Sequence, residues 1–315
     1  MGEQLRGLQR GGASVIQTGS STPLASQGDS GADGTGGAKQ VGYPPDDKFV
    51  GGAPSYDVGH STPAQISELK KSSDPKMRLL GTTIEHAKSA YADTLANGGR
   101  ITATASAGNG GNPVLTIVPP GFDATKPATV QTHYHGFYTT AAEPKGSQSQ
   151  QTERIQALQK ANPQTVVVLP ECANAPANDS RSEVNNLHSN WSGVSSEAQT
   201  TQDGLKAAGI ANADRFVVSA HSAGGEALRN AIAKHSDGSG LRADRLELLD
   251  CLYGSESSIA GWAKTQNGTQ CQSVFYGHAT NNHSDSGIRA AFGARYSRAE
   301  APGHWETLRF MGSGR

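Results

Sequence analysis

The chain has 315 residues, of which 35% are hydrophobic and 17% charged, and its formal net charge is −1. A nearly neutral chain has no general electrostatic attraction for nucleic acid or anionic membranes, so neither is expected as a partner. No run of about 18 apolar residues occurs, and the sequence therefore predicts no membrane span.

Residues 1–60 form an N-terminal tail rich in Gly, Ser, Thr, Gln and Pro, with few large apolar side chains. Such a composition buries too little surface to offset chain entropy, so the tail is expected to be disordered. No apolar segment follows Arg6 and Arg10, and no ordinary signal peptide is expected. The tail resembles the leaders of effectors exported by bacterial injection machines, while a plain tail of a cytoplasmic protein fits equally well.

Residues 61–99 are expected to form a helical extension. Thr62-Pro63 is a typical helix start, and apolar residues follow at helical spacing. A second helix is predicted over residues 79–95, before the stop signal Asn97-Gly98-Gly99.

From residue 100 the pattern changes to strands, and residues 100–315 are expected to form the main domain. Strands are predicted at 101–105, 114–118, 129–134, 166–169, 216–218, 246–249, 273–276 and 294–297, with helices at 150–160, 196–208, 225–235 and 259–264. A hairpin followed by alternating strands and helices predicts an α/β fold, a doubly wound, mostly parallel sheet with helices on both faces. Ligands of such sheets bind at the carboxyl ends of the strands.

One strand end carries a serine on a sharp turn. Residues 216–218 read as a buried strand, the small residues around Ser222 as a turn, and the following residues as a helix. Small neighbours let the backbone bend tightly and leave the hydroxyl exposed near the positive end of the helix. The segment resembles the nucleophile elbow of α/β-hydrolases, G-x-S-x-G, with Ala220 in place of the first glycine. This resemblance extends over residues 100–310.

The resemblance implies a serine hydrolase that cleaves an ester or amide bond through an acyl-enzyme. Its members supply nucleophile, acid and base in the chain order Ser, Asp/Glu, His, which here gives Ser222, Asp250 and His304. Asp250 ends an apolar strand, whereas the alternative acid, Asp285, follows the next strand within a long loop. A strand end fixes a side chain better than a loop does, so Asp250 is preferred.

Two backbone N–H groups must stabilise the oxyanion that forms during acyl transfer. One is expected from Ala223, directly after the nucleophile. The resemblance implies that the other comes from Phe137 or Tyr138, where Gly136 lets the backbone approach closely.

Four further residues are expected to line the substrate site, namely His135, His221, Glu171 and Trp191. The segment 171–195 is long for a connection within a compact domain and carries little aliphatic surface. It is typical either of a lid over a polar substrate, small or polymeric, or of a disordered insertion.

No cofactor or metal is expected, but two alternatives stay open. His133 and His135 lie two residues apart on a strand and could bind a metal together with His221, His278 or His283. Alternatively, the chain is a non-catalytic binding module with the same fold. The three cysteines, Cys172, Cys251 and Cys271, are too few for a disulfide framework, although one pair could form a bridge.

Overall fold

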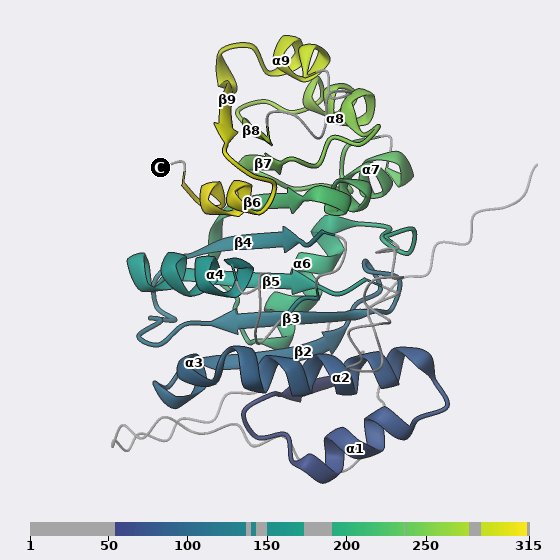
Figure 1. Cartoon of the computed structure of the whole chain (residues 1–315), viewed down its shortest axis with the longest axis vertical. Coiled ribbons are helices and arrows are strands. Elements are labelled where there is room, and N and C mark those ends of the chain that lie inside the picture. The colour runs from purple at the N-terminus through teal and green to yellow at the C-terminus, as the bar shows by residue number, and fades with distance from the viewer. Residues whose placement is uncertain are drawn as a thin grey trace, which may run out of the picture. The chain divides into compact units, whose positions relative to one another are not determined.

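The computed structural model describes residues 54–136, 140–142, 150–172, 191–235, 237–276 and 285–313. Their strands form one sheet in the order β1-β2-β3-β5-β4-β6-β7-β8-β9 (Figure 1). The strands are β1 (Ser55–Asp57), β2 (Arg100–Ala105), β3 (Pro113–Val118), β4 (Ala128–Tyr134), β5 (Thr165–Pro170), β6 (Ala213–His221), β7 (Arg245–Leu249), β8 (Gln270–Tyr276) and β9 (Tyr296–Ala301). The helices are α1 (Pro63–Lys71), α2 (Pro75–Ala90), α3 (Ala92–Ala96), α4 (Gln150–Ala161), α6 (Glu197–Ala207), α7 (Gly225–Lys234), α8 (Glu256–Ala263) and α9 (Ser286–Phe292).

The sheet is antiparallel at one end and parallel from β5 to β9. β1, β2, β3 and β5 pair antiparallel in turn, and the order then runs parallel through β4, β6, β7, β8 and β9. The β2–β3 pair is the hairpin that the sequence predicts. Because all strands from β4 onward point the same way, their carboxyl ends lie along one edge of the sheet, where the candidate site is built.

Helices cover both faces of this sheet, and each face has its own core. On one face Leu80 and Ile84 of α2 and Ile155 of α4 pack against β3 and β5. On the other, Leu228 of α7 and Trp262 of α8 pack against β6 and β7. Figure 1 shows α2 and α4 on the near face and α6 on the far face. The predicted doubly wound, mostly parallel sheet with helices on both faces is therefore confirmed.

The folded chain begins earlier than the sequence predicts. Residues 54–60, assigned to the tail, include β1, which pairs with β2, and Val58, whose side chain is fully buried. The Val58 N–H donates to the carbonyl of Ile101 at 2.9 Å. Three residues of strand in a Gly- and Ser-rich segment leave no periodic pattern, which is why composition alone missed them. Residues 1–53 lie outside the described residues.

Truncation is expected to separate these two segments. Deleting residues 1–53 should leave the Tm unchanged, because that segment has few side chains able to join a core. Deleting residues 1–60 should lower the Tm by roughly 5 °C, because it removes an edge strand and a buried valine worth about 2 kcal/mol. Differential scanning calorimetry of the two truncations measures this, and equal Tm values would mean that β1 contributes nothing to the fold.

The helical extension contains three helices where two are predicted. Thr62 caps α1, its hydroxyl accepting from the Gln65 N–H while the Gln65 side chain accepts from the Thr62 N–H. Near the other end of the chain, α9 is a helix that the sequence analysis misses, and the last strand runs over 296–301 rather than 294–297. Among the described residues, no helix has the length and apolar character needed to cross a membrane. The three cysteines are buried free thiols, so the possible disulfide is not formed.

Candidate active site

Ser222 lies directly after β6 in a left-handed backbone conformation. Its φ is 52°, and it begins a short 3₁₀ turn, Ser222–Gly224, that leads into α7. A non-glycine residue with positive φ is strained, and such strain concentrates at functional sites. The sharp turn that the sequence predicts at this serine is therefore present.

Close packing requires the glycine that ends the turn, Gly224, and the glycine that begins α7, Gly225. A Cβ on Gly224 would collide with the backbone carbonyl of Tyr134 at the end of β4. A Cβ on Gly225 would collide with the carbonyl of Cys251, just after β7. The start of α7 is thus wedged between the ends of the two strands that flank β6, which fixes Ser222 relative to both.

Asp250, which is buried, and His304, whose side chain is 26% exposed, form a hydrogen-bonded pair. Asp250 follows β7, is 1% exposed and has φ 48°. One of its carboxylate oxygens lies 2.5 Å from Nδ1 of His304, which follows β9. Because a carboxylate only accepts, Nδ1 carries the proton and Nε2 of the neutral imidazole is left as an acceptor. The backbone N–H of Asp250 donates to the Val274 carbonyl at 2.7 Å, which holds the acid in place.

Asp285, the alternative acid, is engaged elsewhere. Its carboxylate accepts from the Tyr296 hydroxyl at 2.5 Å, from Arg289 at 3.1 Å and from Arg298 at 3.3 Å. These partners belong to α9 and to β9 at the edge of the sheet. Burial raises the pKa of Asp285, but the tyrosine bond and the two arginines outweigh it, so the pKa falls below its ordinary value.

His221, which the sequence analysis expects at the substrate site, is buried between the serine turn and the loop that carries His304. It is 1% exposed, and its Nε2 lies 3.2 Å from the backbone carbonyl of His304. Its ring centre lies 4.6 Å from that of His304 and 5.2 Å from that of Trp305. Burial and the neighbouring His304 hold the pKa of His221 well below its usual value, so the ring is neutral.

Gly136 brings the loop after β4 against the serine. A Cβ on Gly136 would lie 2.9 Å from the Cβ of Ser222 and 3.0 Å from Nδ1 of His221. Only glycine permits that approach, as the sequence analysis expects. Ala223, the other expected oxyanion residue, adjoins Ser222 and is 8% exposed. Phe137 and Tyr138 lie outside the described residues.

His135 and Glu171, both expected at the substrate site, form a buried ion pair. Both are 1% exposed, with Nε2 of His135 and a Glu171 carboxylate oxygen 3.0 Å apart. Glu171 also accepts from the N–H groups of Ala141 and Cys172 at 2.9 and 3.1 Å. Burial alone would lower the pKa of His135, but Glu171 and Cys172 raise it well above its usual value. Trp191, also expected at the substrate, is fully buried 4.8 Å from the His135 ring.

The alternative pairing of His133 with His135 in a metal site does not occur among the described residues. β4 ends at Tyr134, so the strand alternation does not continue to His135. His133 instead bonds the Ser219 hydroxyl at 2.8 Å, and burial lowers its pKa to about 3. In the described part of the chain, the group with ligand-like spacing is His135, Glu171 and Cys172, whose donor atoms lie within 4.8 Å.

The Glu171 carboxylate of that group already accepts hydrogen bonds from the His135 ring and from the N–H groups of Ala141 and Cys172. His278 and His283 lie outside the described residues, as does segment 173–190 of the expected lid.

Sequence reasoning missed two aromatic residues, Tyr253 beside the serine and Trp305 beside the histidine. Tyr253 is 46% exposed and forms a hydrogen bond with the Ser222 side chain. Partial burial and the Asp250 charge raise the pKa of Tyr253, more than this hydrogen bond lowers it. Trp305 follows His304, and the two rings meet edge to face with centres 5.7 Å apart. The sequence could have indicated both residues by their positions, because Tyr253 lies three residues after Asp250 and Trp305 directly follows His304.

Comparison with known proteins finds similar solved structures at low sequence identity. The sequence matches no protein-family model and no curated protein. An esterase from Pseudomonas putida is similar in structure, with 10% identity and a TM-score of 0.39 over 62% of this chain and 72% of that chain. EstE7, a homologue of hormone-sensitive lipase from a metagenome library, has 15% identity and a TM-score of 0.41 over 75% and 91%. A puromycin-hydrolysing peptidase from Mycobacterium tuberculosis has 14% identity and a TM-score of 0.41 over 70% and 39%.

Proposed function

We propose that the protein is a serine hydrolase that cleaves an ester or amide bond through an acyl-enzyme. Ser222 is the nucleophile, His304 the general base and Asp250 the acid that orients the base. The observation that carries the proposal is the convergence of a strained serine with a hydrogen-bonded Asp250–His304 pair at the carboxyl edge of one sheet. A hydroxyl is a poor nucleophile until a positioned base takes its proton.

In the proposed reaction, Ser222 Oγ attacks the substrate carbonyl carbon while Nε2 of His304 takes the hydroxyl proton. Asp250 holds the imidazole in the required tautomer and stabilises the imidazolium that forms. His304 then gives the proton to the departing alcohol or amine as the carbon–heteroatom bond breaks. In the second half, water attacks the acyl carbon while His304 takes its proton. His304 then returns that proton to Ser222 Oγ as the acyl–serine bond breaks, which releases the carboxylic acid and restores the free serine.

The tetrahedral oxyanion needs donors that are already in place before the reaction. The proposed first donor is the N–H of Ala223, and the second is the N–H of Phe137, which follows Gly136. The ion pair of His135 with Glu171 supports this assignment, because Glu171 binds the chain on both sides of residues 137–139, at His135 and at Ala141. We therefore assign to this ion pair the role of positioning the segment that would carry the second oxyanion donor.

His221 is proposed as a positioning residue for the base. Its ring contacts the His304 ring, and its Nε2–H donates to the His304 carbonyl. Because His221 stays neutral, it does not repel the imidazolium that His304 becomes during the reaction.

A fluorophosphonate probe tests the proposal, because covalent labelling requires an activated serine. The wild-type protein should be labelled at one site, and peptide mass spectrometry should find the adduct on Ser222. Absence of labelling under conditions that label a control hydrolase would favour the non-catalytic binding module. A panel of short esters, amides and polar esters then identifies the bond that is cleaved.

Chelation is expected to leave turnover unchanged. The proposed steps use a serine, an imidazole and a carboxylate, and none of them requires a metal ion. Activity on a small ester should be the same before and after overnight dialysis against EDTA. Loss of activity that is restored by Zn²⁺ would instead support metal-assisted hydrolysis.

A further inference from the structure

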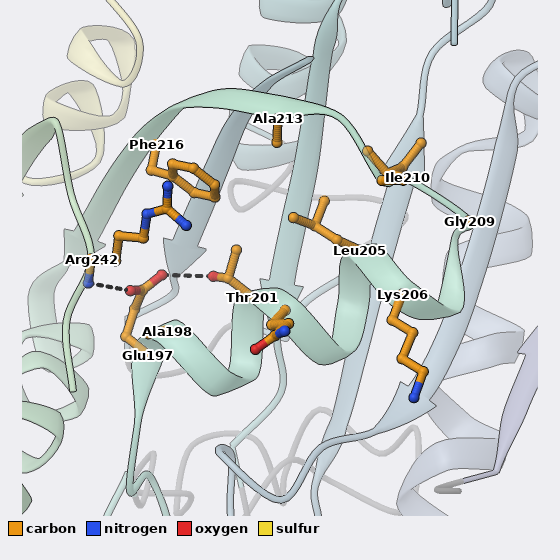
Figure 2. A pocket seen from close by; sticks show the side chains of 12 residues that line it. Glu197, Ala198, Thr201, Leu205, Lys206, Gly209, Ile210, Ala213, Phe216 and Arg242 are labelled. Atoms are coloured by element: carbon orange, nitrogen blue, oxygen red, sulfur yellow. Dashed lines mark hydrogen bonds between the residues drawn. The ribbon is translucent and has the colours of Figure 1, made fainter. Parts of the chain in front are cut away.

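A groove lies beside α6, away from the candidate active site (Figure 2). It encloses about 590 Å³ and is lined in part by Leu205, Ile210, Ala213, Phe216, Lys206 and Arg242. The volume is within the range of small-molecule sites, which are mainly apolar with a few polar groups. Six residues of extended β6 separate Phe216 from Ser222, roughly 20 Å, so the groove is distinct from the site of the proposed reaction.

Two cations at this groove lack counter-ions. Among the described residues, neither the Arg242 guanidinium nor the Lys206 ammonium forms an ion pair or a hydrogen bond; both side chains are exposed. The Arg242 guanidinium lies 3.9 Å from the centre of the Phe216 ring, stacked on its face. Stacking engages the face of the guanidinium and leaves its N–H edges available for a carboxylate. Figure 2 shows Arg242 near the start of α6 and Lys206 near its end.

The acidic residue of the lining does not neutralise these cations fully. Glu197 is 1% exposed, and its two carboxylate oxygens accept from the Thr201 hydroxyl at 2.6 Å and from the Arg242 backbone N–H at 3.0 Å. Burial raises the pKa of Glu197 to about 7, more than its hydrogen bonds and Arg242 lower it. Near neutral pH this carboxyl therefore carries only part of a negative charge, and the lining is positive overall.

We propose that this groove binds a small organic anion with an apolar body, of the medium-chain carboxylate class. The carboxylate would accept from the guanidinium edge of Arg242, with Lys206 adding attraction from the other end of α6. The hydrocarbon chain would lie along Leu205, Ile210 and Ala213. Charge complementarity selects this occupant, because a neutral chain would leave both cations unpaired and an amphiphilic cation would be repelled.

Decanoate is a suitable probe. The measurement uses the full-length Ser222→Ala protein, because this variant lacks the proposed nucleophile and should not react during the titration. Isothermal titration calorimetry below the micellar concentration should give saturable binding at one site. Arg242→Gln should weaken binding about tenfold, the effect of losing one charge-assisted contact. Lys206→Gln should weaken it about threefold. Ala213→Leu should block binding by filling the groove with a side chain.

Arg215→Gln is the matched control for Arg242→Gln. Arg215 is an exposed arginine on β6, the strand that carries Ala213 and Phe216, but it does not line the groove. This control should leave the affinity for decanoate unchanged. Circular dichroism checks that each variant is folded. The proposal is overturned if decanoate does not bind, or if Arg242→Gln leaves its affinity unchanged. It is also overturned if Arg215→Gln lowers the affinity as much as Arg242→Gln does, or if decylammonium binds more tightly than decanoate.

Discussion

The Ser222→Ala variant is expected to lose covalent labelling and nearly all turnover. In a serine mechanism, removal of the nucleophile leaves only the oxyanion donors and substrate binding, and kcat falls on the order of 10⁶-fold. The fall should appear in kcat much more than in KM, because the hydroxyl forms its bond only after binding. Steady-state kinetics on a small ester, together with probe labelling of the purified variant, measure both effects.

The fold should survive this change. Ser222 has positive φ, which alanine tolerates no better than serine, and the substitution removes a single oxygen. The matched control is Ser257→Ala, because Ser257 is exposed on α8 and contributes nothing to the proposed steps. That control should retain full activity. Turnover or labelling that persists in Ser222→Ala would remove Ser222 from the reaction and end the serine-hydrolase proposal.

The sequence predicts the serine turn because its signal is local. An apolar strand, a run of small residues and a helix start stand next to one another, and the structure explains the small residues by collisions that side chains at Gly224 and Gly225 would cause. The approach of Asp250 to His304 is not local, since 54 residues separate them. It became predictable because the family resemblance implies the chain order Ser, Asp, His, and because parallel strands place their carboxyl ends on one edge of the sheet.

The direction of polar side chains could not be predicted in the same way. His135, Glu171 and His221 all stand at strand ends, which is where substrate-lining residues are expected. A strand end, however, does not determine whether a polar side chain faces the ligand or another polar group. Here His135 and Glu171 face each other, and His221 faces the backbone of His304. Each contact joins residues that are distant in sequence, so neither composition nor periodicity could predict it.

The Asp250→Asn variant is expected to lower kcat by roughly three to four orders of magnitude while the protein stays folded. Asparagine keeps the shape of the side chain but presents an amide, which cannot fix the same imidazole tautomer or stabilise the imidazolium. The carboxylate is 1% exposed and lies 2.5 Å from His304 Nδ1, so no water can readily replace it. Measuring kcat on a small ester, with circular dichroism for the fold, gives the effect.

The Asp285→Asn variant should lower kcat less than about tenfold, or roughly 1.4 kcal/mol of barrier. Its carboxylate bonds Tyr296, Arg289 and Arg298, so the substitution weakens the packing of α9 on β9 and leaves the His304 imidazole untouched. The cost should therefore appear in the Tm rather than in kcat. The opposite pattern, in which Asp285→Asn abolishes turnover and Asp250→Asn spares it, would transfer the orienting role to Asp285. It would also require the 285 carboxylate to leave its two arginines during the reaction.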